Sequence, residues 1–533
     1  MGATHALWLL AVPVSALIVA AFARRTGFAA PLALVIAGLA LSYAPGVPEF
    51  ELEPEFVLYV FLPPLLFSAA WNSSYYNMRE NLRPIGLLSV GLVVFSTIAV
   101  GYAAWWLVPG LPLASAFVLG AIVAPPDAVA AVGVAQRLGL PRRLVTILVG
   151  ESLFNDATAL TLFRVALAAA VGAGFSLGEG VGRFAFAAVA GAAIGLALGP
   201  PLHWLRTRLR DPLVENALAI TVPFAAYLIA EALGASGVIA VVVSGLYLGH
   251  RFTESPAVTR LIGHSFWKVV DFFLESVVFL LIGLQLPPVV HGLSGGGWTQ
   301  LVWWAAAVFV ATVAARFAWV FATGYVPALF SRRQRASRAA IGWRGHVVVA
   351  WAGMRGVVSL AAAFAIPFAT DAGRTFPGRD LILFLTFTTV LGTLLVQGLT
   401  FPALIRLLGV GGGREGYEDT LAEAGAHHAA ARAALDRLDE LTGGDEPLDE
   451  EVLARLRQLA ENQQFRAWER LGGGTGQGGA EVPSATYRRL RLEMLAAERA
   501  TFVRLRDERR IDDEVLNRVL HELDLEEAAL GRR

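Results

Sequence analysis

Long runs of apolar residues, separated by short polar segments, occupy the first 410 residues of the 533-residue chain. A helix that crosses the hydrocarbon core of a bilayer needs roughly 20 mostly apolar residues, with a range of about 17–25. The pattern therefore predicts an all-α polytopic membrane domain with about thirteen transmembrane helices, although twelve or fourteen crossings would also fit. The approximate bounds of the runs are 5–22, 28–44, 55–71, 84–108, 113–134, 144–172, 182–205, 214–234, 236–250, 266–287, 299–330, 342–368 and 380–408.

Beyond residue 410 the pattern changes to charged segments in which apolar residues recur at helical spacing. A glycine-rich stretch, Gly472–Gly479, interrupts these segments, and Asp512 is suited to cap a last helix. We therefore divide the chain into a transmembrane domain, residues 1–410, and a helical tail, residues 411–533. The pattern leaves open whether the tail regulates, forms dimer contacts or is simply a solvated appendage.

Composition agrees with this division, because only 16% of the residues are charged and 56% are hydrophobic. Soluble proteins usually carry about 25% charged residues. The net charge is zero, but residues 1–410 hold 25 Lys and Arg against 17 Asp and Glu, whereas residues 411–533 hold 18 against 26. With no cysteine and no hydrolytic, nucleotide-binding or metal-binding motif, the sequence predicts neither an enzyme nor a nucleic-acid-binding protein, and it predicts no cofactor.

The loops between the predicted helices carry very different charges on the two faces of the membrane. One face has 18 Lys and Arg, and the opposite loops have only Arg183, Arg374 and Arg379. Cytoplasmic loops retain basic residues. We therefore expect a multi-pass protein of the cell membrane whose N-terminus is outside and whose C-terminus and tail are cytoplasmic.

The sixth predicted span contains two carboxylates, Glu151 and Asp156, within the sequence GESLFND. A charged side chain at the bilayer centre costs at least ~2.5–3.5 kcal/mol, so each one needs a reason to be there. Helical spacing places Ser152 and Asp156 on one face, and Glu151 and Asn155 on another about 100° away. One helix thus offers two carboxylates to different neighbours. We predict that Asp156 binds the transported ion, with simple packing as the alternative.

The fifth span contains Pro125, Pro126 and Asp127 in its middle. Two adjacent prolines remove two backbone donors and clash with the preceding turn, so the helix must break there. Interrupted helices at membrane depth expose carbonyl groups with which transporters build cation sites. Asp127 therefore either ligates the cation or neutralises the positive N-terminal end of the second half-helix.

Two arginines lie inside later spans, Arg316 in the eleventh and Arg355 in the twelfth. Both need an acidic or carbonyl partner, and Glu151 is the available structural candidate. Gly353 and Gly356 suggest a second broken helix, with Arg355 stabilising the C-terminal end of a half-helix.

Four further charged residues give weaker signals. Asp271 and Glu275, one turn apart in the tenth span, indicate either an access funnel or, for Asp271, an interfacial position. Glu231 lies near a span end, which indicates the interface. Arg164 either extends its head group to the membrane surface or pairs nearby.

The motifs as a set resemble the monovalent cation/proton antiporters, which include the bacterial NhaP type and the animal sodium/proton exchangers. The resemblance covers residues 5–410, and its most specific element is the sixth-span sequence. The matching segments are GESLFNDATAL at 150–160, FLPP at 61–64, AEALGASG at 230–237 and GMRG at 353–356. The family implies a homodimer of inverted repeats, in which an ion-carrying core with the two broken spans moves like an elevator against a dimer scaffold.

The resemblance also implies roles for individual residues. Asp156 would bind cation and proton alternately, with Ser152 and Asp127 as co-ligands of Na⁺ and Asn155 beside it. Glu151 would pair with Arg316 to hold the core together. The Asn-Asp order resembles the electroneutral members, which implies one proton for each cation.

At two positions the chain departs from the family pattern. Pro126 stands where many members have threonine, and Ser68 stands where many have an acid. Both departures leave the coordination shell, and the choice between Na⁺ and K⁺, open. The resemblance predicts exchange of Na⁺ or K⁺ for H⁺. A cation channel gated by the acidic tail is the alternative, which the lack of a repeated filter-like sequence disfavours.

Overall fold

The computed structural model describes residues 3–44, 54–127, 129–172, 177–209, 211–291, 293, 297–330, 332–410, 413–442, 449–471 and 483–531. Within these ranges the chain forms helices and turns, with one isolated β-bridge between Ala369 and Thr375. It divides into two compact units, Met1–Gly411 and Gly412–Arg533. The glycine-rich stretch predicted to interrupt the tail lies outside the described residues.

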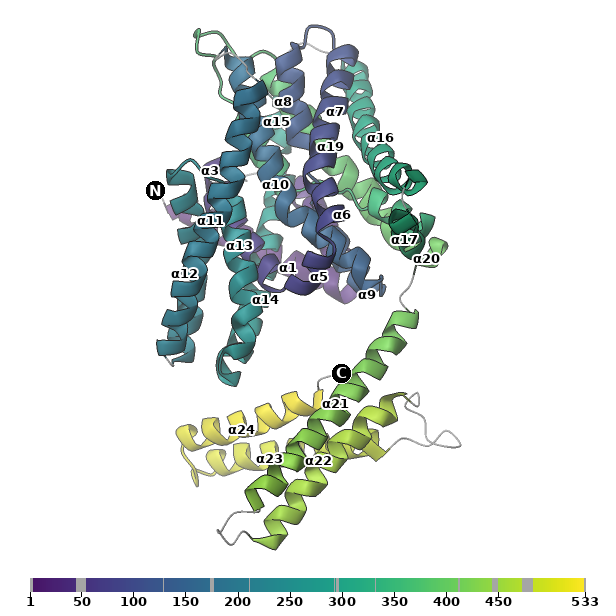
Figure 1. Ribbon diagram of the computed structural model, residues 1–533. Coiled ribbons are helices and arrows are strands. Elements are labelled where there is room, and N and C mark those ends of the chain that lie inside the picture. Colours follow the sequence, from purple (N-terminus) through teal and green to yellow (C-terminus); the bar gives the residue numbers. More distant parts are fainter. Residues whose placement is uncertain are drawn as a thin grey trace. The chain divides into compact units, whose positions relative to one another are not determined.

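In the first unit, each predicted apolar run coincides with one helix or with consecutive helical segments (Figure 1). In chain order the segments are α1 (Ala3–Thr26), α2 (Ala30–Ser42), α3 (Pro54–Phe56), η1 (Val57–Phe61), α4 (Leu62–Trp71), α5 (Tyr75–Glu80), α6 (Leu82–Gly86), η2 (Leu87–Leu92), α7 (Val93–Leu107), α8 (Leu113–Val123), α9 (Val129–Arg137), α10 (Arg142–Val171), α11 (Leu177–Leu209), α12 (Pro212–Ala232), α13 (Gly237–His250), η3 (Arg251–Glu254), α14 (Ala257–Leu284), α15 (Leu286–His291), α16 (Trp298–Phe330), α17 (Arg332–Trp351), α18 (Val357–Phe364), α19 (Arg379–Gly392), η4 (Thr393–Gln397) and α20 (Gly398–Leu408).

Six continuous helical stretches among the described residues are long and apolar enough to cross a membrane. They are Leu82–Leu107, Arg142–Val171, Gly180–Leu209, Pro212–Ala232, Trp298–Val326 and Arg379–Leu408. Shorter apolar helices lie at Ala30–Ser42, Val57–Trp71 and Leu113–Val123. The described residues of the first unit are therefore helical, with several helices long and apolar enough to cross a membrane, whereas the total of thirteen crossings stays a prediction.

Two of the predicted spans are interrupted. The helix of span five ends at Val123 and resumes at Val129, because Pro125 and Pro126 cannot continue it. The helix of span twelve ends at Trp351 and resumes at Val357, with Gly356 in an extended conformation as the N-cap of α18. Both interruptions lie where the prolines and glycines predict them.

The helices of the first unit pack in two groups. In one, which we call the α13 group, α4, α11 and α12 surround α13, and α14 connects them to α1 and α2. In the other, the α8 group, α7, α10, α18 and α19 surround α8, and α16 packs on α7, α17 and α19. Helix α10 belongs to the α8 group through α8 and η2, and it also contacts α4 and α13. It therefore lies at the boundary between the groups.

Helices α2 and α14 approach closely because glycines meet at their crossing. A Cβ atom on Gly38 would lie 2.3 Å from the carbonyl oxygen of Leu280, and one on Gly283 would lie 2.3 Å from that of Val35. Small residues allow such backbone contact between membrane helices.

The second unit contains α21 (Gly413–Thr442), α22 (Glu450–Leu471), α23 (Pro483–Asp507) and α24 (Asp513–Gly531). Helix α21 packs on α22, and α23 packs on α24. Arg491 on α23 bonds Glu526 on α24 at 2.6 Å and Glu498 on its own helix at 2.8 Å. Leu495 of α23 and Leu516 of α24 are buried. Asp512 directly precedes α24.

We expect Gly283→Ala to lower the melting temperature of the purified protein by several degrees. The added methyl group must push α2 and α14 apart, and overpacking of this kind costs about 1–3 kcal/mol. Gly86→Ala is the matched control, because a Cβ atom at Gly86 has no atom within 4 Å. Equal melting temperatures of the two variants would show that the α2–α14 contact is not tight.

Candidate functional site

The two interrupted helices bond to each other at their breaks. The backbone N–H of Asp127 donates to the carbonyl oxygen of Met354 at 2.7 Å, and the Nε of Arg355 donates to the carbonyl oxygen of Val123 at 2.6 Å. Each break thus supplies a hydrogen-bond partner for a backbone group of the other break. At membrane depth this matters, because no water is present to replace a lost partner.

Arg355 stabilises the end of α8. Its guanidinium, which is 1% exposed, bonds the carbonyl oxygens of Val123 and Gly353, and its backbone N–H donates to Thr393 Oγ1 at 2.9 Å. Val123 is the last residue of α8, so its carbonyl has no partner within that helix. The helix end that Arg355 caps therefore belongs to the other interrupted span, a detail that the sequence did not specify. Thr393 was not among the predicted site residues.

Arg316 on α16 forms a bidentate ion pair with Glu151 on α10. Its Nη2 lies 2.9 Å from Glu151 Oε2, and its Nη1 bonds Glu151 Oε1. The same guanidinium donates to the carbonyl oxygen of Val349 at 2.9 and 3.1 Å and to that of Ala352 at 3.4 Å. Both charged side chains are almost fully buried, at 1% and 2% exposure. The pair joins α10 and α16 and also caps the end of α17.

Asn155 connects α10 to the break in span five. Its Nδ2 donates to the carbonyl oxygen of Pro126 at 2.5 Å, while its Oδ1 is buried without a hydrogen-bond partner among the described residues. Asp156 follows directly and is 9% exposed. Ser152 lies one turn earlier on the same helix and is partly buried. Asn155 therefore contacts the break in span five directly, and Asp156 is its neighbour on the same helix.

The carboxylate of Asp127 lies against Gly356, the N-cap residue of α18. A Cβ atom on Gly356 would be 1.8 Å from Asp127 Oδ2, so only glycine leaves room for this carboxylate. The negative charge thus faces the N-terminal end of α18, where it is stabilised by the helix dipole. Asp127 also interacts electrostatically with Asp156. Both predicted roles of Asp127, cation ligand and dipole partner, remain compatible with this position. Ala128, the next residue, lies outside the described residues.

Helix α14 brings a carboxylate to Ser68, where the sequence lacks the acid that many family members have. Ser68 Oγ donates to Asp271 Oδ2 at 2.6 Å, although the two residues are 203 positions apart. Glu275, one turn further along α14, interacts electrostatically with both Asp271 and Asp127. Asp271 is partly buried, and both interpretations of it, an access funnel and an interfacial position, stay predictions. No signal in the sequence paired it with Ser68.

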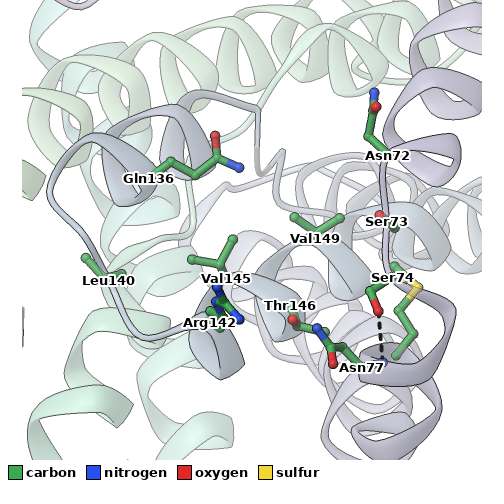
Figure 2. Close-up of a pocket in the computed structure, with 11 residues that line it drawn as sticks. Asn72, Ser73, Ser74, Asn77, Gln136, Leu140, Arg142, Val145, Thr146 and Val149 are labelled. Atoms are coloured by element: carbon green, nitrogen blue, oxygen red, sulfur yellow. Dashed lines mark hydrogen bonds between the residues drawn. The ribbon is translucent and has the colours of Figure 1, made fainter. Parts of the chain in front are cut away.

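A pocket of about 400 Å³ opens beside the first half of α10. Figure 2 shows its lining, which comes from the α4–α5 segment on one side and from α9 and α10 on the other. Most lining side chains are uncharged and polar. They are Asn72, Ser73, Ser74, Asn77, Met78, Gln136, Leu140, Arg142, Val145, Thr146 and Val149. Val149 precedes Asp156 by seven residues, which is about 10 Å along the helix.

Two interrupted helices that bond to each other at their breaks, beside buried carboxylates, are typical of the ion sites of secondary transporters. Residues 14–407 match the family model described as sodium/hydrogen exchanger, transmembrane. The chain belongs to this family.

Relatives and a solved structure agree with the assignment. An uncharacterized Na⁺/H⁺ exchanger of Mycobacterium tuberculosis is 36% identical over 94% of this chain and 91% of its own length. The Na⁺/H⁺ antiporter ApNhaP of Aphanothece halophytica is 36% identical over 76% of this chain and 74% of its own. The structure of the sodium proton antiporter MjNhaP1 of Methanocaldococcus jannaschii superposes with a TM-score of 0.59 at 19% identity, covering 75% of this chain and 98% of that one. That last match shows the fold.

Glu151→Gln should destabilise the protein strongly, because it leaves the charge of Arg316 buried without a counter-charge. Breaking a buried pair by removing one partner costs about 3–5 kcal/mol. We expect a large fall in the melting temperature, and we expect Glu151→Met combined with Arg316→Met to recover part of it. If the single variant melts like the wild type, the pair does not hold α10 to α16.

Gly356→Ala should abolish transport, because the new methyl group overlaps Asp127 Oδ2 and must displace that carboxylate. Cation-driven proton movement in proteoliposomes is the measurement. Gly133→Ala is the control, since a Cβ atom there has no neighbour within 4 Å. Transport at the wild-type rate by Gly356→Ala would contradict the close contact.

Proposed function

We propose that this chain exchanges Na⁺ for H⁺ across the cell membrane and binds the two ions alternately at Asp156. The observation that carries the proposal is the position of Asp156, buried on α10 beside the crossing of the two breaks. Membership of the sodium/hydrogen exchanger family supports the same ions.

A single carboxylate couples the two fluxes through its charge. A bare carboxylate inside the membrane is costly, whereas a carboxylate that holds a proton or a Na⁺ is neutral. The part of the protein that carries Asp156 can therefore change its access from one side to the other only when one of the two ions is bound. Each ion thus moves only in exchange for the other, by alternating access.

The surrounding charges support one proton for each cation. Glu151 is neutralised by Arg316, and the residue directly before Asp156 is the uncharged Asn155. Asp156 is therefore the carboxylate on α10 whose charge is left to bind an ion, which makes the exchange electroneutral.

Asp127 and Ser152 complete the proposed Na⁺ site with Asp156. Carboxylate and hydroxyl oxygens are the hard ligands that alkali and alkaline-earth cations prefer. Pro126 offers no hydroxyl to the cation, where many family members have threonine. Its carbonyl group does not replace that ligand, because it already accepts a hydrogen bond from Asn155. K⁺ is the second candidate substrate for the same shell.

The proposal includes the arrangement of the chain in the membrane. Residues 1–410 form the antiporter domain, with thirteen crossings in two inverted repeats and the N-terminus outside. Residues 411–533 form a cytoplasmic tail. Two copies associate as a homodimer, and the physiological role is pH and sodium homeostasis. The channel alternative finds no support in the family assignment.

Dequenching of a pH-sensitive dye in proteoliposomes tests the exchange. We expect Na⁺, and in a second series K⁺, to drive proton movement in the wild type, and we expect Asp156→Asn to be inactive because its side chain can no longer change charge. Asp371→Asn, the same substitution in an exposed turn, is the matched control.

Clamping the membrane potential with valinomycin and K⁺ separates the outcomes. Exchange that is unchanged by the clamp supports the electroneutral stoichiometry. Wild-type exchange by Asp156→Asn would refute the assignment of the site. A cation current that does not level off as the ion gradient is increased would favour a channel.

A further inference from the structure

Helix α10 has different surroundings at its two ends. On the side of Arg142, it lines the pocket of Figure 2 together with the α4–α5 segment. On the side of Val171, Arg164 on α10 forms an ion pair with Glu231 on α12, with Nη2 2.9 Å from Oε2. Arg164 follows Asp156 by eight residues, or about 12 Å. Asp156 thus lies about midway between the part of α10 that lines the pocket and the residue that forms the ion pair.

The ion pair connects the two helix groups defined above. Arg164 belongs to the α8 group, whereas Glu231 is fixed in the α13 group, because its Oε1 accepts the backbone N–H of Gly237 at 3.3 Å. Gly237 is the first residue of α13, so Glu231 also caps that helix. A change in the position of α10 relative to α12 must break the contact between Arg164 and Glu231 while the contact with Gly237 persists.

Tyr227 is a buried residue of α12 near both Asp156 and the ion pair. It lies one turn before Glu231 on α12, is 2% exposed, and packs edge-on against Tyr59 with ring centroids 5.6 Å apart. Its hydroxyl group interacts electrostatically with Asp156, Arg164 and Glu231. A Cβ atom on Gly237 would lie 2.7 Å from the ring, so the ring is held tightly.

We propose that Arg164 and Glu231 form a latch that keeps the second route to Asp156 closed behind the ring of Tyr227. The latch is shut in the present structure, in which the pocket at the other end is open. It opens each time α10 moves to give Asp156 access from the opposite side. The inference rests on the alternating access proposed above and assigns the residues that control it.

The exposure of the pair suits a contact that must break in every cycle. The side chains of Arg164 and Glu231 are 59% and 21% exposed, whereas those of Arg316 and Glu151 are at most 2% exposed. A partly exposed ion pair contributes little to stability and can open easily, but a buried pair cannot be separated without a large penalty.

The absence of cysteine from the sequence allows a direct test. Thr146→Cys introduces one thiol into the pocket with little change in size, and its rate of modification by a polar maleimide in detergent reports how often the pocket end is open. Arg164→Gln and Glu231→Gln should slow this rate about two- to fivefold, the factor expected from losing a partly exposed ion pair. Arg164→Glu should slow it further, and adding Glu231→Arg should restore it.

Arg251→Gln in the same reporter background is the matched control. It removes an ion pair of similar length, 2.8 Å to Glu254, that lies within one turn of chain and does not connect the two groups. Its modification rate should equal that of the reporter alone. If the Arg164 variants fail to fold, Glu231→Gln carries the test, since its amide oxygen still accepts the N–H of Gly237.

Modification rates that stay unchanged in the Arg164 and Glu231 variants would overturn the proposal. A lower melting temperature without a change in rate would also overturn it, because the pair would then be only structural. Exchange by the Thr146→Cys protein is measured in parallel. Failure of exchange by the wild-type protein refutes the proposed function, whereas normal exchange with unshifted rates refutes the latch alone.

Discussion

The buried ion pair between Glu151 and Arg316 is the interaction on which the rest of the transmembrane unit depends. Arg316 reaches the bilayer interior only because Glu151 offers two oxygens and the end of α17 offers carbonyl groups. Two charges removed from water are tolerable when nearly every donor and acceptor is satisfied. Because the guanidinium of Arg316 on α16 bonds both α10 and α17, these three helices keep one arrangement around the break in span twelve.

The breaks in spans five and twelve also stabilise each other. Arg355 caps α8, and Asp127 faces the N-terminus of α18, so a positive side chain lies at a C-terminal end and a negative one at an N-terminal end. Interrupted helices leave unpaired backbone groups that would be prohibitive in hydrocarbon. Here the charged side chains of Arg355 and Asp127 interact with these backbone groups, so their charges are already neutralised by the helix ends. Asp156 differs from these groups, because no ion pair occupies its carboxylate in the described contacts, and it is therefore suited to exchange ligands.

Strong and weak ion pairs have different places in this unit. The strong pair lies within the α8 group and holds the residues around Asp156 in fixed positions. The weaker, exposed pair between Arg164 and Glu231 lies at the boundary with the α13 group. In the alternating access that we propose, a block that moves as a rigid body needs permanent contacts inside it and reversible contacts at its surface. The distribution of burial in this molecule matches that requirement.

The sequence by itself determined the helical membrane unit, both helix interruptions and the placement of Glu151, Asn155 and Asp156 on one helix. Hydropathy, proline sterics and helical periodicity are properties of neighbouring residues, so they can be read along the chain. The pairing of Glu151 with Arg316 came from the resemblance to a family and from the need of a buried charge for a partner. Only the tertiary structure decided that Arg355 caps α8, that Asp271 bonds Ser68 and that Arg164 meets Glu231. These contacts join residues that are 67 to 232 positions apart, and they depend on which helix faces pack together, which no local pattern encodes.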